Sequence, residues 1–253
     1  MQIDQVLSGI VATYPQSQIE LQSRDAPRIA FHLRLLADHV PAGGTVADIG
    51  GGLGLFSPGV AALGFKSILV DDFRDRGNIE IAQDVFQKVH ERCGVTIVSR
   101  DVVADGVDFK AGSLDAVTTF DSIEHWHHSP KRVLHQLMAA LKPNGLIVIG
   151  VPNCVNLLKR ITVPLGFGKW SQMADWYEEA TFRGHVREPD VGDLRYIARD
   201  LGLTEVRIIG RNWMGYDHRS ALIRRVAPVI DGPLRLFPSL CANIYLIGRK
   251  SLR

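Results

Sequence analysis

Apolar residues follow two different periods along the chain. Helical spacing predicts helices over residues 28–40, 55–63, 79–92, 131–141 and 191–201. Short β-prone runs predict strands at residues 45–49, 67–70, 95–99, 116–120, 146–151, 206–209 and 244–247. Because parallel strands need long crossover connections, this alternation predicts an α/β fold in which helices cover both faces of a mainly parallel sheet.

The regular alternation lapses between residues 152 and 190. This stretch is rich in aromatic side chains, and it contains Phe167, Trp170, Trp176, Tyr177 and Phe182. It is either a lid over a substrate or a minor hydrophobic cluster that caps the core. We predict one domain over residues 1–253, with lead-in helices in 1–44, a substrate cap inserted at 152–190 and a second insert at 211–240.

Composition excludes several classes of protein. The 253 residues carry 29 basic and 27 acidic side chains, so no strong overall field favours nucleic acid as a partner. The three cysteines show no pairing or metal-site spacing, which favours a reducing compartment. Neither a leader peptide nor a membrane span is recognisable, and we expect a cytoplasmic protein whose oligomeric state the sequence does not define.

The charge is unevenly distributed. Residues 219–253 contain seven basic residues and a single acidic one, Asp231. This segment is either a solvated basic face or a dock for a phosphorylated or lipid-surface substrate, which includes peripheral contact with a membrane.

The strongest local motif lies between the first predicted strand and the helix that follows it. It reads Asp48-Ile-Gly-Gly-Gly-Leu-Gly54, with glycines at positions 50, 51, 52 and 54. Glycines let the backbone turn sharply and approach a ligand, and the helix N-terminus points into the same crevice. The same motif also occurs in dinucleotide-binding proteins and in purely structural turns, so the neighbouring residues must distinguish these possibilities.

Two acidic positions favour S-adenosylmethionine (SAM) over a nicotinamide cofactor. Asp48 precedes the glycines, where it would repel a pyrophosphate but suit the ammonium of a methionine moiety. Asp71 and Asp72 end the second strand, where a carboxylate can accept hydrogen bonds from both ribose hydroxyls. An acid at the end of the second strand also occurs in NAD enzymes, whereas an acid at the position of Asp48 is less typical of them.

Taken together, the motifs resemble those of the class I SAM-dependent methyltransferases, in particular their ubiquinone-biosynthesis-like small-molecule branch. The similarity covers roughly residues 46–153 and, more weakly, 183–209. Its motifs occur in order at Asp48–Gly54, Val70-Asp71, Asp101-Val102, Ser113–His125, Leu141–Gly145 and Val151–Asn153. The resemblance implies a Rossmann-like, doubly wound, mostly parallel seven-stranded sheet with a C-terminal antiparallel strand and an inserted cap.

The resemblance also implies roles for individual residues. Residues 50–54 surround the methionine part of SAM, and Asp71 binds the ribose, with Asp72 as the alternative. Asp101 reaches the adenine amine, although Asp105 or Asp108 could be mistaken for it, and a backbone group of Val102 contributes a contact. Phe120, at the end of the fourth strand, is the remaining candidate for cofactor contact.

Similar methyltransferases hold a divalent cation with Glu-x-x-Glu-His at the end of the fourth strand and a distant histidine. This chain has Asp121-Ser-Ile-Glu124-His125, in which aspartate replaces the first glutamate, and His185 is the distant candidate. Such a set suits Mg²⁺, Mn²⁺ or Zn²⁺. The alternative is that Glu124 and His125 only cap the turn.

The expected reaction is methyl transfer by in-line displacement to a small-molecule acceptor, or to a saccharide- or lipid-linked one. His125 and His185 are the candidate bases, because imidazole titrates near neutral pH. Phe120-Asp-Ser-Ile stands where nitrogen-methylating relatives often carry Asn/Asp-Pro-Pro-aromatic, which favours oxygen as the acceptor atom. A catalytically silent SAM-binding protein and an NAD(P)-binding oxidoreductase remain alternatives.

Overall fold

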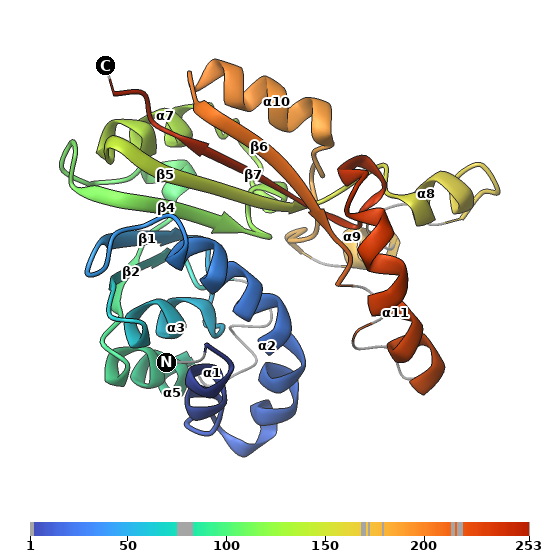
Figure 1. Ribbon diagram of the computed structural model, residues 1–253, viewed down its shortest axis with the longest axis horizontal. Coiled ribbons are helices and arrows are strands. Elements are labelled where there is room, and N and C mark those ends of the chain that lie inside the picture. The colour runs from blue at the N-terminus through green and yellow to red at the C-terminus, as the bar shows by residue number, and fades with distance from the viewer. Residues whose placement is uncertain are drawn as a thin grey trace. The chain divides into compact units, whose positions relative to one another are not determined.

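The computed structural model describes residues 3–74, 83–167, 171, 173–178, 180–213, 216 and 220–252. Its seven strands form one sheet in the order β3-β2-β1-β4-β5-β7-β6, flanked by helices (Figure 1). Six strands are parallel and β7 (Asn243–Arg249) runs antiparallel to its neighbour β6 (Thr204–Arg211). The prediction of a doubly wound, mostly parallel seven-stranded sheet with a C-terminal antiparallel strand is confirmed.

The chain divides into two compact units. The first comprises residues 1–119, 130–147 and 250–253, and the second comprises 120–129 and 148–249. The predicted single domain over 1–253, with its inserts, remains a prediction. Among the described residues, no helix is both long and apolar enough to cross a membrane.

The first unit contains the parallel strands β1 (Thr45–Ile49), β2 (Lys66–Asp71), β3 (Thr96–Ser99) and most of β4 (Leu114–Phe120). Ile49 is paired with Val70, and Asp71 with Ser99. The register therefore brings the carboxyl ends of these strands to one edge of the sheet, where open α/β sheets bind their ligands.

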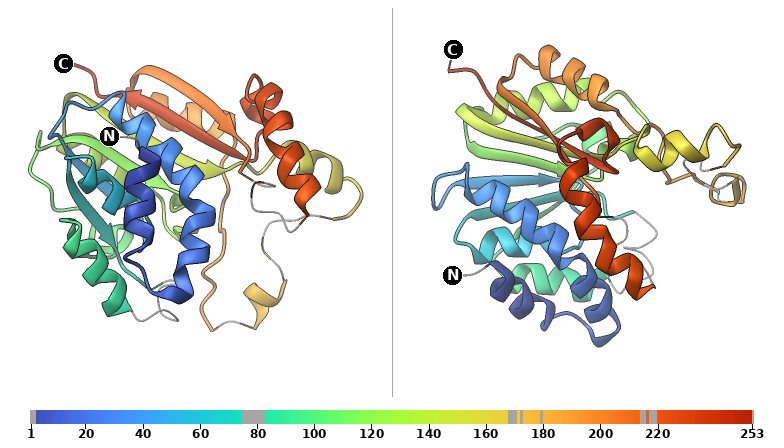
Figure 2. Two further views of the ribbon diagram at one scale, coloured as in Figure 1. Left: turned by 60° about the horizontal axis from the view of Figure 1, so that its bottom comes forward. Right: turned by 45° about the vertical axis from the view of Figure 1, so that its right-hand side comes forward.

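Helices of this unit lie beside its strands (Figure 2). They are α1 (Ile3–Val11), α2 (Gln16–Ala37), α3 (Phe56–Ala62), α5 (Gln83–Arg92), α6 (Val102–Asp105) and α7 (Lys131–Ala140). α3 packs on β2, and α5 packs on β3. Strand β5 (Leu141–Pro152) begins in this unit and ends in the second.

Among its described residues, the second unit holds the β6–β7 pair and several short and long helices. They are η1 (Ile123–His125), α8 (Leu157–Thr162), α9 (Met173–Tyr177), α10 (Val191–Asp200) and α11 (Ala221–Leu234), followed by the short turn η2 (Pro238–Leu240). α10 begins with a reciprocal capping box between Asp190 and Asp193, which fixes its first residue.

Most predicted elements lie within a few residues of the observed ones, and three begin at a different residue. α2 begins at Gln16 rather than 28, because the helix continues through Pro27. β5 begins at Leu141 rather than 146, so it includes the Leu141–Gly145 motif. The predicted helix 79–92 is observed from Gln83, and residues 79–82 lie outside the described part.

Candidate functional site

The glycine loop follows β1 directly. Gly50 and Gly52 have φ angles of +68° and +57°, which side chains rarely tolerate. A Cβ atom at Gly51 would lie 2.0 Å from the Asp48 carboxylate, so no larger residue fits there. At Gly54 the same atom would meet no protein atom within 4 Å. The loop therefore presents bare backbone to open space at Gly54, which a ligand can approach.

Asp71, at the end of β2, is hydrogen-bonded to the loop. The Gly52 N–H donates to its Oδ2 at 2.9 Å, and the Phe73 N–H donates to its Oδ1 at 2.6 Å. These two donors hold the carboxylate beside the glycines. An ionised carboxylate can accept about four hydrogen bonds, so two backbone donors do not by themselves saturate it.

Asp48 is buried beneath the loop. Its carboxylate accepts hydrogen bonds from Ser57 Oγ at 2.9 Å and from Thr118 Oγ1 at 3.1 Å. Burial raises the pKa of Asp48 to about 7; these hydrogen bonds oppose the rise, and the charge of Asp71 adds to it. Asp48 thus changes charge near neutral pH, directly under the segment where sequence reasoning places a methionine ammonium.

The other acids expected near the cofactor lie on neighbouring turns. Asp72 accepts the Arg74 N–H at 3.0 Å, which shapes the turn after β2. Asp101 is the N-cap of α6, and its Oδ1 accepts the N–H groups of Val103 and Ala104. Val102 is buried in the same turn. The predicted alternatives Asp105 and Asp108 do not have this capping position.

Tyr14, from the turn after α1, is a loop contact that sequence reasoning missed. Its hydroxyl lies 3.2 Å from the Leu53 carbonyl oxygen and 3.1 Å from that of Gly54, so it donates to the glycine loop. Its ring packs edge-on against Phe86 of α5. Burial raises the pKa of Tyr14, which stays a donor. Since the contact spans some forty residues of sequence, no local pattern signals it.

In the second unit, Phe120 and Asp121 shape the exit from β4. The Phe120 ring lies 6.2 Å from that of Tyr245 on β7. Asp121 has a φ of +48°, and its N–H donates to the Gly150 carbonyl oxygen at 2.9 Å. A left-handed aspartate at this point redirects the chain sharply into η1.

Glu124, His125 and His185 come together on η1 and the segment that crosses it. The N–H groups of Val186 and Arg187 donate to the Glu124 carbonyl oxygen, which anchors that segment. The two imidazole rings stand edge to face, with centroids 4.7 Å apart. One ligand atom from each of the three residues lies within 4.8 Å of the others; among the described residues, Asp121 is not a member of this group.

The Nδ1 atoms of both histidines are hydrogen-bonded to oxygen atoms of the protein. His125 Nδ1 lies 2.8 Å from the Arg183 carbonyl oxygen, and His185 Nδ1 lies 2.7 Å from Glu188 Oε1. Because carbonyl and carboxylate oxygens only accept, each Nδ1 carries a proton. In the neutral ring, Nε2 is then the basic nitrogen.

Glu188 is a second residue that sequence reasoning missed. Its nearly buried carboxylate also accepts a hydrogen bond from Lys159. Burial by itself would raise the pKa of Glu188, but the hydrogen bonds and charges of His185 and Lys159 outweigh it and lower the pKa. The three-residue spacing from His185 was the available signal, because it suits a turn that joins the two side chains.

Two further histidines and the described tryptophan and tyrosine of the predicted cap lie at the surface. His127 contacts the Phe182 carbonyl oxygen through Nε2, and His128 is exposed. Trp176 and Tyr177 are exposed on α9, and Trp170 lies outside the described residues. The predicted aromatic cap remains a prediction.

Residues 21–208 match the family of methyltransferase domains. The chain belongs to this family. No curated protein matches the sequence significantly. The structural neighbours show the fold of SAM-dependent methyltransferases, so the family resemblance inferred from the motifs is confirmed at that level. The ubiquinone-biosynthesis-like branch is not distinguished.

Three solved structures illustrate this likeness. A SAM-dependent methyltransferase from Archaeoglobus fulgidus has a TM-score of 0.56 at 21% identity, covering 87% of this chain and 92% of that one. A possible histamine N-methyltransferase from Thermotoga maritima has a TM-score of 0.56 at 16% identity, covering 98% and 100%. Phosphoethanolamine N-methyltransferase 2 from Haemonchus contortus, in complex with SAM, has a TM-score of 0.55 at 17% identity. The match covers 87% of this chain and 52% of that one.

Proposed function

We propose that this protein is a SAM-dependent methyltransferase that acts on an oxygen atom of a small-molecule, saccharide-linked or lipid-linked acceptor. The observation that carries the proposal is the hydrogen bond from the Gly52 N–H to Asp71. It places the Asp71 carboxylate against bare glycine backbone at the carboxyl edge of the sheet. This combination suits a ribose next to a methionine moiety.

The residues around the glycine loop offer a contact for each part of SAM. Open space at Gly54 leaves room for the methionine part, and the Asp71 carboxylate would accept hydrogen bonds from the ribose hydroxyls. Asp101 would bind the adenine amine, with a Val102 backbone contact beside it. Asp48 would support the ammonium through its charge, and Phe120 stays a candidate contact to the cofactor.

The cofactor supplies an activated methyl group on a sulfonium, so the protein's own tasks are alignment and removal of one proton. His185 Nε2 is our candidate for the proton acceptor. Glu188 orients the ring through Nδ1 and stabilises the imidazolium, and Lys159 keeps Glu188 ionised. His125 Nε2 is the alternative base, since its Nδ1 is oriented by a carbonyl in the same way.

The same cluster is compatible with a divalent cation. Glu124, His125 and His185 offer one oxygen and two nitrogens, and the two engaged Nδ1 atoms are typical of metal-ligating histidines whose Nε2 faces the ion. A cation there would orient and acidify an acceptor hydroxyl. In both versions of the proposal these residues activate the acceptor hydroxyl, either by accepting its proton or by holding a cation next to it.

Two other functions are distinguished by specific observations. A catalytically silent SAM-binding protein would need the cofactor loop but not the His185–Glu188 pair. An NAD(P)-binding oxidoreductase would also use the loop and Asp71, but it leaves the buried Asp48 under the loop without a role, and the chain belongs to the methyltransferase-domain family.

The proposal is tested with SAM that carries a deuterated methyl group. The protein is incubated with this SAM and, separately, with small-molecule, lipid, RNA and protein fractions. We expect production of S-adenosylhomocysteine with the small-molecule or lipid fraction, and fragmentation should place the label on oxygen. Label in RNA or protein, or on nitrogen, would contradict the acceptor assignment, and a His185→Ala variant that retains full turnover would contradict the proposed base.

A further inference from the structure

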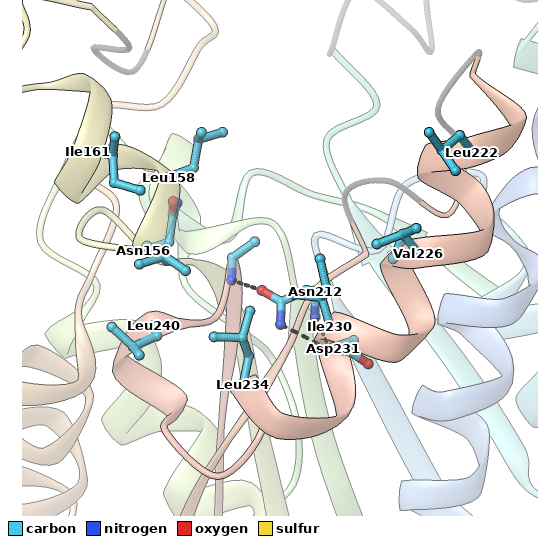
Figure 3. A pocket seen from close by; sticks show the side chains of 13 residues that line it. Asn156, Leu158, Ile161, Asn212, Leu222, Val226, Ile230, Asp231, Leu234 and Leu240 are labelled. Carbon is cyan, nitrogen blue, oxygen red and sulfur yellow. Dashed lines mark hydrogen bonds between the residues drawn. The ribbon is translucent and has the colours of Figure 1, made fainter.

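Helices α8 and α11 face each other across an apolar pocket of about 490 Å³. Leu158 and Ile161 point into it from α8, and Leu222, Val226, Ile230 and Leu234 point into it from α11 (Figure 3). Both helices belong to the second unit. None of the residues assigned to the cofactor or to proton transfer lines this pocket.

The few polar side chains in the pocket wall are hydrogen-bonded within the protein. Asn156 accepts the Lys159 N–H and donates to the Asn153 carbonyl oxygen. Asn212 donates to Asp231 and accepts the Ala242 N–H. Asp231 also accepts hydrogen bonds from Tyr216 and Arg235. The wall therefore offers hydrocarbon contact, which suits an alkyl chain better than a polar headgroup.

α11 and the residues just after α8 carry strongly exposed apolar side chains, of which Leu222 also lines the pocket. Leu222 and Val229 on α11 are 70% and 72% exposed, and Leu165 and Phe167, just after α8, are 68% and 71% exposed. Single exposed apolar residues are ordinary, but a contiguous group around an apolar pocket marks an interaction surface.

The charge of the same segments limits what can cover them. Residues 157–167 contain Lys159 and Arg160 and no acid, and residues 220–237 contain three arginines and only Asp231. Asp231 is buried and paired with Arg235. A second copy of this surface would place like charges together, whereas an anionic surface would be attracted.

We propose that the α8–α11 surface docks the protein on an anionic phospholipid bilayer, with an acyl chain occupying the pocket. α11 would lie at the interface, where its apolar residues enter the acyl region and Arg224 and Arg225 meet lipid phosphates. This inference concerns membrane attachment and goes beyond the proposed methyl transfer. Its test uses no SAM, so it can fail or succeed independently.

The test is sedimentation of the 253-residue chain with vesicles of phosphatidylcholine alone, or of equal parts phosphatidylcholine and phosphatidylglycerol. Leu222→Glu and Val229→Glu each put a charge on an exposed position of α11, and each should lower partitioning onto anionic vesicles about tenfold. An Arg224→Glu/Arg225→Glu double variant should lose at least about tenfold on anionic vesicles, with little change on zwitterionic ones.

Leu21→Glu on α2 is the matched control, because Leu21 is a 55% exposed leucine in the first unit. We expect it to bind as the wild type does, and thermal unfolding should show that all the variants are folded. Wild-type protein that stays in the supernatant with anionic vesicles at low salt would overturn the proposal. So would variants that bind normally, or a dimer in ultracentrifugation that Leu222→Glu abolishes without any vesicle binding.

Discussion

Replacing Asp71 by asparagine tests the cofactor site most sharply, because the structure separates its two contributions. In the wild type, both carboxylate oxygens accept backbone N–H groups, at 2.9 Å from Gly52 and 2.6 Å from Phe73. An asparagine has one acceptor oxygen, so its amide N–H₂ must face one of these donors. The loop then loses a hydrogen bond, and the ribose loses a charged acceptor.

The expected magnitude follows from hydrogen bonds to a charged group, which are worth about 1.5–3 kcal/mol each. Loss of one such bond to the ribose corresponds to a dissociation constant for SAM that is roughly 10- to 100-fold higher. The unpaired backbone donor should also lower the free energy of unfolding by about 1–3 kcal/mol. Titration calorimetry measures the first effect, and urea unfolding measures the second.

Asp72→Asn is the matched control. Asp72 is the same residue type and directly follows Asp71, but its carboxylate accepts a hydrogen bond from the Arg74 N–H, which shapes the turn after β2. We expect SAM binding close to that of the wild type. If Asp72→Asn weakens SAM binding and Asp71→Asn does not, the ribose ligand is Asp72 and the reasoning from the Gly52 hydrogen bond is refuted.

Three further outcomes follow from the site. Gly54→Val should abolish SAM binding because the side chain would fill the space proposed for the ligand, and the protein should stay folded because no protein atom occupies that space. An equal loss of SAM binding in the remote Gly9→Ala control would indicate a general fault in folding. Because the pKa of Asp48 is raised to about 7, its contribution to stability is fully present below about pH 4 and is lost as the pH rises to about 7 and above. Asp48→Asn should therefore be more stable than the wild type at pH 8 by on the order of 4 kcal/mol, and by less at pH 5. A difference in urea unfolding that does not change with pH would contradict the raised pKa. Glu188→Gln should lower turnover about 10- to 100-fold and spare SAM binding, because His185 loses the carboxylate that stabilises its charged form, and a pH–rate profile that does not move would show that Glu188 is only structural.

The sheet and the glycine loop could be predicted because they depend on local sequence. Strands such as 45–49 are short β-prone runs, and glycines follow the first of them directly. α11 could not be predicted in the same way. Pro228 and Pro233 lie inside it, and proline in a helix interior normally argues against a helix.

Parts of the site depend on contacts between distant segments, which the sequence does not encode locally. The tyrosine that donates to the glycine loop comes from a turn some forty residues earlier. His185 was predicted as a partner of His125, yet Lys159, which hydrogen-bonds Glu188, comes from α8, 29 residues before Glu188 in the sequence. Burial of Asp48, and hence its raised pKa, also depends on tertiary packing, and its hydrogen-bond partner Thr118 lies 70 residues away in the sequence.

Calorimetric titration of the folded protein with SAM, with NAD⁺ as the matched control ligand, tests the proposed cofactor most directly. We predict one SAM bound per chain with micromolar affinity and no heat of binding from NAD⁺. Folded protein that gives no heat with SAM, or that binds NAD⁺ instead, would contradict the methyltransferase assignment of the glycine loop and of Asp71.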